Sequence, residues 1–107
     1  MSVEDKNKID AISTNKENQV VLTISDHLEW DDSNEHLIIL QDKVNSYLDF
    51  LESGQIDESY PSAAGKKIMI QIVFKFLPNK KGEVFIGKLE AIIKGNGYDF
   101  NFYQLAE

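Results

Sequence analysis

Hydrophobic and polar residues alternate along four segments of the chain, and this pattern predicts β-strands. A weak alternation at 8–13 and a β-branched one at 19–25 flank a polar turn, which predicts a hairpin. The clearest alternation covers 67–77, and the last covers 98–105. In the third segment, five large apolar side chains face one way: Ile68, Ile70, Ile72, Phe74 and Phe76. That pattern is typical of a central strand over the core.

Two other segments repeat their apolar residues every three or four positions, which predicts amphipathic helices. The first covers 33–53, and its apolar face is formed by Leu37, Leu40, Val44, Tyr47, Leu48 and Leu51. Asp32 with Glu35 three residues later has the spacing of a capping box, and Gly54 is a stop signal. The second helix is expected to follow the N-cap Asn79 and to run to about 94. Residues 54–66 are expected to form an ordered loop.

The predicted order is β-β-α-β-α-β in one domain covering 1–107, with residues 1–7 frayed. Two helices cannot cover both faces of a four-stranded sheet, and alternating strands are half-exposed rather than fully buried. We therefore predict an α+β fold, a two-layer sandwich in which a four-stranded mixed sheet has both helices on one face. The other face would carry Val21, Met69, Val73, Tyr103 and Leu105, either as a partner surface or as ordinary half-exposed residues.

Composition excludes several classes of protein. The chain has no cysteine, so it has no disulfide, no thiolate nucleophile and no cysteine-built metal site. Its longest apolar run, 37–40, cannot span a membrane, and its first residues do not read as a signal peptide. A cytoplasmic location without membrane association is expected.

Charge is unevenly distributed along the sequence. The chain holds 18 acidic and 11 basic residues, for a net charge of -7, and every basic residue is lysine. Residues 17–65 hold 11 acids with Lys43 as the single base, whereas 66–94 hold seven lysines and two acids. Nucleic-acid binding depends on neutralising phosphates, and arginine is the usual reader of bases, so nucleic acid is not an expected partner.

The densest chemistry lies at 26–36, which contains both histidines and a cluster of carboxylates. A metal site could use His27, His36, Glu29 and Asp31, but their spacing matches no metal motif. Carboxylates before a helix are also favoured by capping and by the helix dipole. The chain has no nucleophile signature, no phosphate-binding loop and no cofactor fingerprint, so neither an enzyme nor a cofactor is predicted.

Trp30 is the one tryptophan, and it lies in this acidic segment. It could anchor a partner protein, as tryptophans do at binding hot spots. It could equally form a lid over one end of the core.

The stretch Ile24-Ser25-Asp26-His27-Leu28-Glu29-Trp30-Asp31, continued by Glu35-His36-Leu37 and by Leu51-Glu52-Ser53-Gly54, resembles a known family. This is an uncharacterised bacterial family of small acidic proteins that carry a domain of unknown function. The resemblance implies family membership over nearly the whole chain and no particular activity.

Two functions fit these features. The first is an immunity protein that neutralises a cognate protein toxin, for example a basic nuclease domain, through acidic residues that steer and pair with lysines and arginines. The residues predicted to contact that partner are Asp26, His27, Glu29, Trp30, Asp31, Asp32, Glu35, Asp57 and Glu58. The alternative is a non-catalytic homodimeric or adaptor-like domain that binds through the open face of its sheet.

Overall fold

The computed structural model describes residues 9–31 and 34–105. Its strands and helices are β1 (Ala11–Thr14), β2 (Val20–Asp26), α1 (Glu35–Glu52), α2 (Gln55–Ser59), the 3-10 turn η1 (Pro61–Ala63), β3 (Ile68–Phe74), α3 (Lys80–Gly95) and β4 (Asp99–Gln104). The α+β class and the order of the main elements are confirmed. Residues 1–7 and Asp32, for which fraying and a capping role were predicted, lie outside the described residues.

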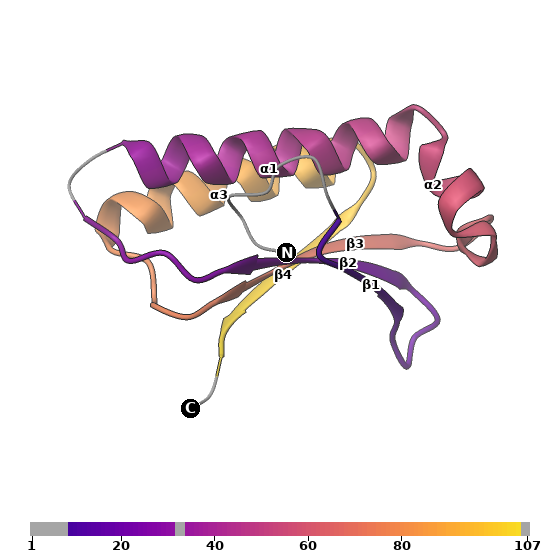
Figure 1. The fold of residues 1–107 in the computed structure, drawn as a ribbon, viewed down its shortest axis with the longest axis horizontal. Coiled ribbons are helices and arrows are strands. Elements are labelled where there is room, and N and C mark those ends of the chain that lie inside the picture. Colours follow the sequence, from indigo (N-terminus) through magenta and orange to yellow (C-terminus); the bar gives the residue numbers. More distant parts are fainter. Residues whose placement is uncertain (1–8, 32–33, 106–107) are drawn as a thin grey trace.

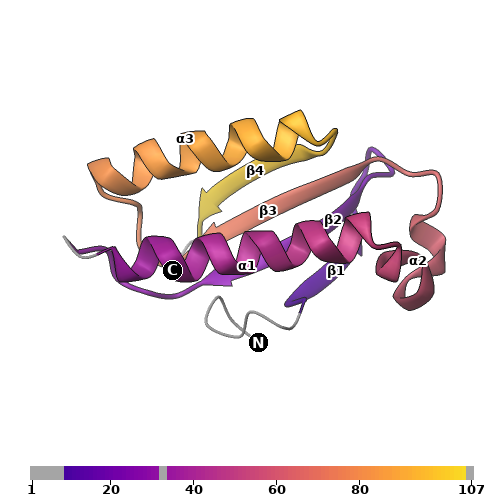
Figure 2. The ribbon, with the colours of Figure 1, turned by 90° about the horizontal axis from the view of Figure 1, so that it is seen from above.

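The four strands form one mixed sheet in the order β1-β2-β3-β4. β1 pairs antiparallel with β2, while β2–β3 and β3–β4 are parallel pairs. A parallel pair needs a crossover connection, and α1 and α3 provide the two crossovers. Both helices lie on the same face of the sheet (Figure 1), and they run side by side above it (Figure 2). The predicted two-layer arrangement is therefore confirmed.

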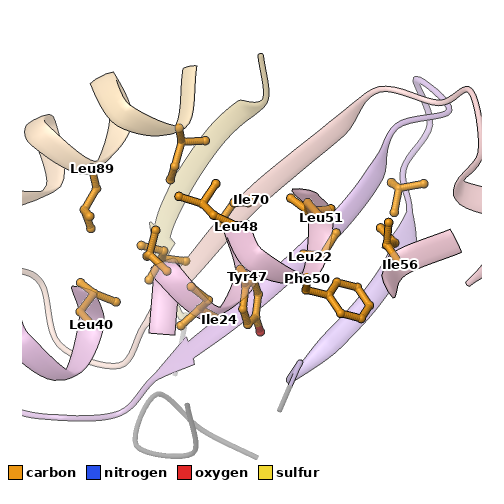
Figure 3. Close-up of a cluster of buried hydrophobic side chains, with 14 of the residues drawn as sticks. Leu22, Ile24, Leu40, Tyr47, Leu48, Phe50, Leu51, Ile56, Ile70 and Leu89 are labelled. Atoms are coloured by element: carbon orange, nitrogen blue, oxygen red, sulfur yellow. The ribbon is translucent and has the colours of Figure 1, made fainter. Parts of the chain in front are cut away.

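The core lies between this helical layer and the sheet. Alternate residues of the central strands point into it, so Leu22, Ile24, Ile70, Ile72 and Phe74 are completely buried. Leu40 and Tyr47 of α1 and Leu89 of α3 meet them from above (Figure 3). The predicted inward face of the third strand is thus the inward face of β3.

The segment predicted to be a loop, 54–66, contains α2 and η1. Ile56 and Ala63 are buried in the core cluster, so this connection closes one end of the fold. A five-residue helix is too short to display a 3.6-residue repeat, and the sequence pattern therefore missed it.

α1 begins at Glu35, and its N-cap position is Asn34, which makes no capping hydrogen bond with its side chain. Of the predicted apolar face, Leu37 is only half-buried, and the buried face of this helix also includes His36, Lys43 and Phe50. By contrast, Asn79 caps α3 as predicted, because its side-chain oxygen accepts from the backbone N–H of Gly82 at 2.8 Å.

The open face of the sheet is more polar than its alternating sequence indicated. Thr23, Gln71 and Asn101 form a row across β2, β3 and β4, joined by amide hydrogen bonds of 3.5 and 3.1 Å. Tyr103 and Leu105 are exposed, and they lie beyond this row at the carboxyl end of the strands. No helix within the described residues is long and apolar enough to cross a membrane.

Candidate functional site

The acidic segment between β2 and α1 starts from a buried carboxylate. Asp26 ends β2 with its side chain turned toward the helices, and only 2 % of the residue is exposed. Its Oδ1 accepts from the backbone N–H of Leu28 at 3.1 Å, and its Oδ2 lies 2.6 Å from Nε2 of His36. Asp26 was predicted to contact a partner, but its carboxylate faces inward and is already bound.

His36 is held from both sides of its ring. Nδ1 lies 3.1 Å from the carbonyl oxygen of Glu29, and Nε2 faces Asp26. Both ring nitrogens therefore have a partner inside the protein, one on the carboxylate at the end of β2 and one on the backbone of the loop. Because neither nitrogen is presented to solvent, this histidine is arranged to hold structure together.

Trp30 covers the same pair. Its ring stacks on that of His36 at a centroid distance of 3.8 Å, and its Nε1–H donates to the carbonyl of Phe76 at 3.2 Å. The indole is partly buried against the core cluster. Of the two interpretations open from the sequence, the structure supports the lid over the core.

The loop is also tied to the connection between β3 and α3. Lys75 donates its backbone N–H to the carbonyl of Asp26 at 2.9 Å, and the Asn79 side-chain amide donates to the carbonyl of Asp31 at 3.1 Å. Much of the chemistry concentrated at 26–36 therefore fixes one loop to another. The sequence could not show this, because an irregular loop has no periodicity that separates inward from outward side chains.

The remaining predicted contact residues are exposed but fall into two groups. The first group lies between the end of β2 and the start of α1: His27 directly follows β2, Glu29 and Asp31 come later in the loop, and Glu35 is the first residue of α1. The second group, Asp57 and Glu58, lies on α2, which follows the opposite end of α1 (Figure 1). An 18-residue helix is about 27 Å long, so the two groups are not one cluster. Asp32 lies outside the described residues.

The outer face of α1 connects these two groups. The acidic outer face, as we define it, consists of exposed residues spaced three or four apart: Glu35, Ile38, Asp42, Asn45, Asp49 and Glu52. Lys43 is the one lysine of this helix, and its side chain is completely buried. The same three-and-four spacing that predicted the apolar face could have revealed this acidic one.

Lys43 belongs to a second buried polar group, at the other side of α1. Its Nζ lies 2.9 Å from Oδ1 of Asp10, whose Oδ2 accepts from the backbone N–H of Ser25 at 2.9 Å. The hydroxyl of Tyr47 accepts from the backbone N–H of Asp10 at 2.9 Å and donates to the carbonyl of Thr23 at 2.6 Å. The pKa of the Tyr47 phenol is raised, and burial is the largest cause.

Every buried side-chain nitrogen or oxygen among the described residues has a hydrogen-bond partner, so these groups serve the fold. Among the described residues, no three or more histidine, aspartate or glutamate side chains are placed to hold a metal ion. The acidic outer face of α1 and the open end of the sheet are two exposed features that can serve recognition.

The chain belongs to a family of unknown function (DUF6572), whose family model matches residues 1–106. The membership expected from the sequence is thereby confirmed over nearly the whole chain. Comparisons with curated proteins and with solved structures give no match. Because the family description assigns no activity, the function has to be argued from the geometry.

Proposed function

We propose that this protein is an immunity protein, which acts in the bacterial cytoplasm by binding a protein toxin domain and blocking it. The binding surface is the acidic outer face of α1. The observation that carries the proposal is the exposure of Glu35, Asp42 and Asp49 along one side of a helix whose only lysine is buried.

A basic toxin domain, such as a nuclease, suits this face electrostatically. Carboxylates in a row attract lysines and arginines over a Debye length of about 8 Å at physiological salt, which speeds encounter. Once bound, they occupy the cationic site that would otherwise hold phosphate. The toxin is then inhibited by blockage, with no chemical step.

Ile38 adds an apolar contact within the acidic outer face. This apolar side chain is 56 % exposed, because it lies on the outer side of the helix rather than on its buried face. Interfaces gain most of their energy from a few central contacts from which water is excluded, while charged rims contribute mainly to rate and specificity. In this proposal Ile38 is the apolar contact and its acidic neighbours form the rim.

The two groups of acids at the ends of α1 extend the same surface. Glu29 and Asp31 precede the helix, and Asp57 and Glu58 follow it, all of them exposed. The helix that joins them is fixed to the sheet by the His36–Asp26 and Lys43–Asp10 pairs. A rigid surface loses little conformational entropy on binding, which favours affinity.

The alternative, a homodimer or adaptor that binds through the open face of the sheet, has less support. The row of Thr23, Gln71 and Asn101 crosses the middle of that face and satisfies its own amide groups. A stable homodimer normally buries a continuous and more apolar surface.

A growth assay tests the proposal. Reading frames next to this gene are expressed one at a time in a bacterial host, with and without this protein. We expect one of them to arrest growth and this protein to restore it. If no neighbour is toxic, or if a toxic neighbour is unaffected by this protein, the immunity proposal is contradicted.

A further inference from the structure

A pocket of about 290 Å³ opens at one end of the sheet, away from the acidic outer face of α1. It is lined by Ser25, Asp26, His27, Val73, Lys75 and Leu105. These residues come from the carboxyl ends of β2 and β3 and from the residue that follows β4. In open sheets of parallel strands, the carboxyl ends are where ligands bind.

The walls of the pocket are held in place by the backbone. Ser25 of β2 lies opposite Val73 of β3, and Val73 lies opposite Tyr103 of β4. Beyond the strands, the N–H of Leu105 donates to the carbonyl of Phe74 at 2.7 Å, which continues the pairing past the end of β4. The pocket is therefore a formed feature of the sheet.

Successive side chains of a strand point to opposite faces of the sheet, so the pocket and the buried Asp26–His36 pair lie on opposite faces. Ser25 and His27 are exposed, whereas Asp26 between them is buried. The Asp26 carboxylate is bound to His36 and to the N–H of Leu28, so it does not face a ligand on the open side. The charge at the pocket is therefore that of the exposed Lys75, which lines it together with His27.

The remaining lining is apolar with one hydroxyl. Val73 is half-buried and forms part of the floor, while Leu105 is 54 % exposed and forms one side. An apolar floor with a few polar groups at its edge is the usual composition of a small-molecule site. Here the polar groups are a cation, an imidazole and a hydroxyl, which together suit an anion.

We infer that this pocket binds a small organic carboxylate with a compact apolar body. The carboxylate lies at Lys75 with the Ser25 hydroxyl as a further donor, and the apolar body covers Val73 and Leu105. The site lies on a different face from the acidic outer face of α1 and goes beyond toxin binding. Neither proposal depends on the other.

The test uses the full chain labelled with ¹⁵N and titrated with phenylacetate at constant ionic strength, followed by NMR. We expect saturable shifts at the amides of Ser25, His27, Val73, Lys75 and Leu105, with a Kd in the millimolar range, because so small a ligand makes few contacts. Phenylacetamide lacks the charge and acetate lacks the apolar body. Each is expected to bind at least about fivefold more weakly.

Lys75→Met removes the charge and keeps the length of the side chain. It should weaken phenylacetate binding by about fivefold or more, while Lys88→Met, which removes an exposed lysine from α3, should leave it unchanged. The inference is overturned if no saturable shifts occur at the pocket, if phenylacetamide binds as tightly as phenylacetate, or if Lys75→Met binds like the wild type. Growth rescue by the protein is unaffected by any of these results.

Discussion

At the scale of single residues, Gly82 allows Trp30 to close the end of the core. A Cβ atom built on Gly82 would lie 2.6 and 2.8 Å from two carbons of the Trp30 six-membered ring, closer than real Cβ contacts. The indole is also held by its stacking on His36 and by the hydrogen bond from its Nε1–H to the carbonyl of Phe76. A glycine in the first turn of α3 thus serves packing.

Gly82→Ala should destabilise the protein by about 1–3 kcal/mol, because the added methyl group displaces the indole. Gly87→Ala in the same helix is the matched control, since a Cβ there meets nothing within 4 Å. The control should gain up to about 1 kcal/mol from helix propensity. Urea unfolding monitored by circular dichroism measures the free energy of unfolding of both variants. Equal stability of the two variants would contradict this role for Gly82.

The His36–Asp26 pair is expected to behave as one unit. His36→Phe keeps a ring beside Trp30 but leaves a buried carboxylate with a single donor, the N–H of Leu28. Removing one partner of a buried pair costs about 3 kcal/mol. Asp26→Asn should also destabilise, and the double variant should cost less than the sum of the single ones by about 1–3 kcal/mol. Strict additivity in urea unfolding would show that the two side chains do not interact.

At the scale of elements, Tyr47 joins α1, β2 and the residue before β1. Its hydroxyl bonds the backbone of both Asp10 and Thr23. Tyr47→Phe leaves one buried and one partly buried backbone group without this partner and should cost about 1–3 kcal/mol. Tyr103→Phe, at an exposed tyrosine on the other face, should change stability by less than about 0.5 kcal/mol. Comparable losses in the two variants would contradict this assignment.

Tyr47 also predicts a dependence on pH. Burial raises the pKa of its phenol in the folded state, while the unfolded phenol ionises near its ordinary value of about 10. Its contribution is therefore fully present below about pH 10 and is lost as the pH rises above that value. Urea unfolding at about pH 8 and pH 11 should show a larger loss for the wild type than for Tyr47→Phe. A loss of the same size in both would mean that Tyr47 is not the group responsible.

The regular elements could be predicted because their burial follows a period. Alternation in β3 and the three-and-four spacing in α1 each identified a face that is buried. Lys43 could not be identified as buried, because its partner Asp10 is 33 positions away and the hydrophobic pattern excludes charges from the core. Likewise, the sequence of the irregular loop showed which residue types the candidate site contains. It could not show which of those side chains face inward.

At the scale of the whole molecule, the acidic and basic stretches of the sequence supply two neighbouring helices, α1 and α3 respectively. α1 exposes Glu35, Asp42 and Asp49, whereas α3 exposes Lys80 and Lys88. The two helices lie side by side on one face of the sheet (Figure 2). A basic partner is therefore drawn to one helix of the layer rather than to the layer as a whole, which gives the encounter an orientation.

The most direct measurement is growth rescue against the toxin identified by the neighbour assay. Asp42→Lys with Asp49→Lys reverses the acidic outer face of α1. Glu17→Lys with Glu83→Lys makes the same change in net charge at exposed sites elsewhere. We predict that the wild type and the control restore growth, while reversal on α1 weakens toxin binding by about 100-fold or more and abolishes rescue. If the α1 variant folds and rescues growth as well as the control does, the toxin does not bind this face.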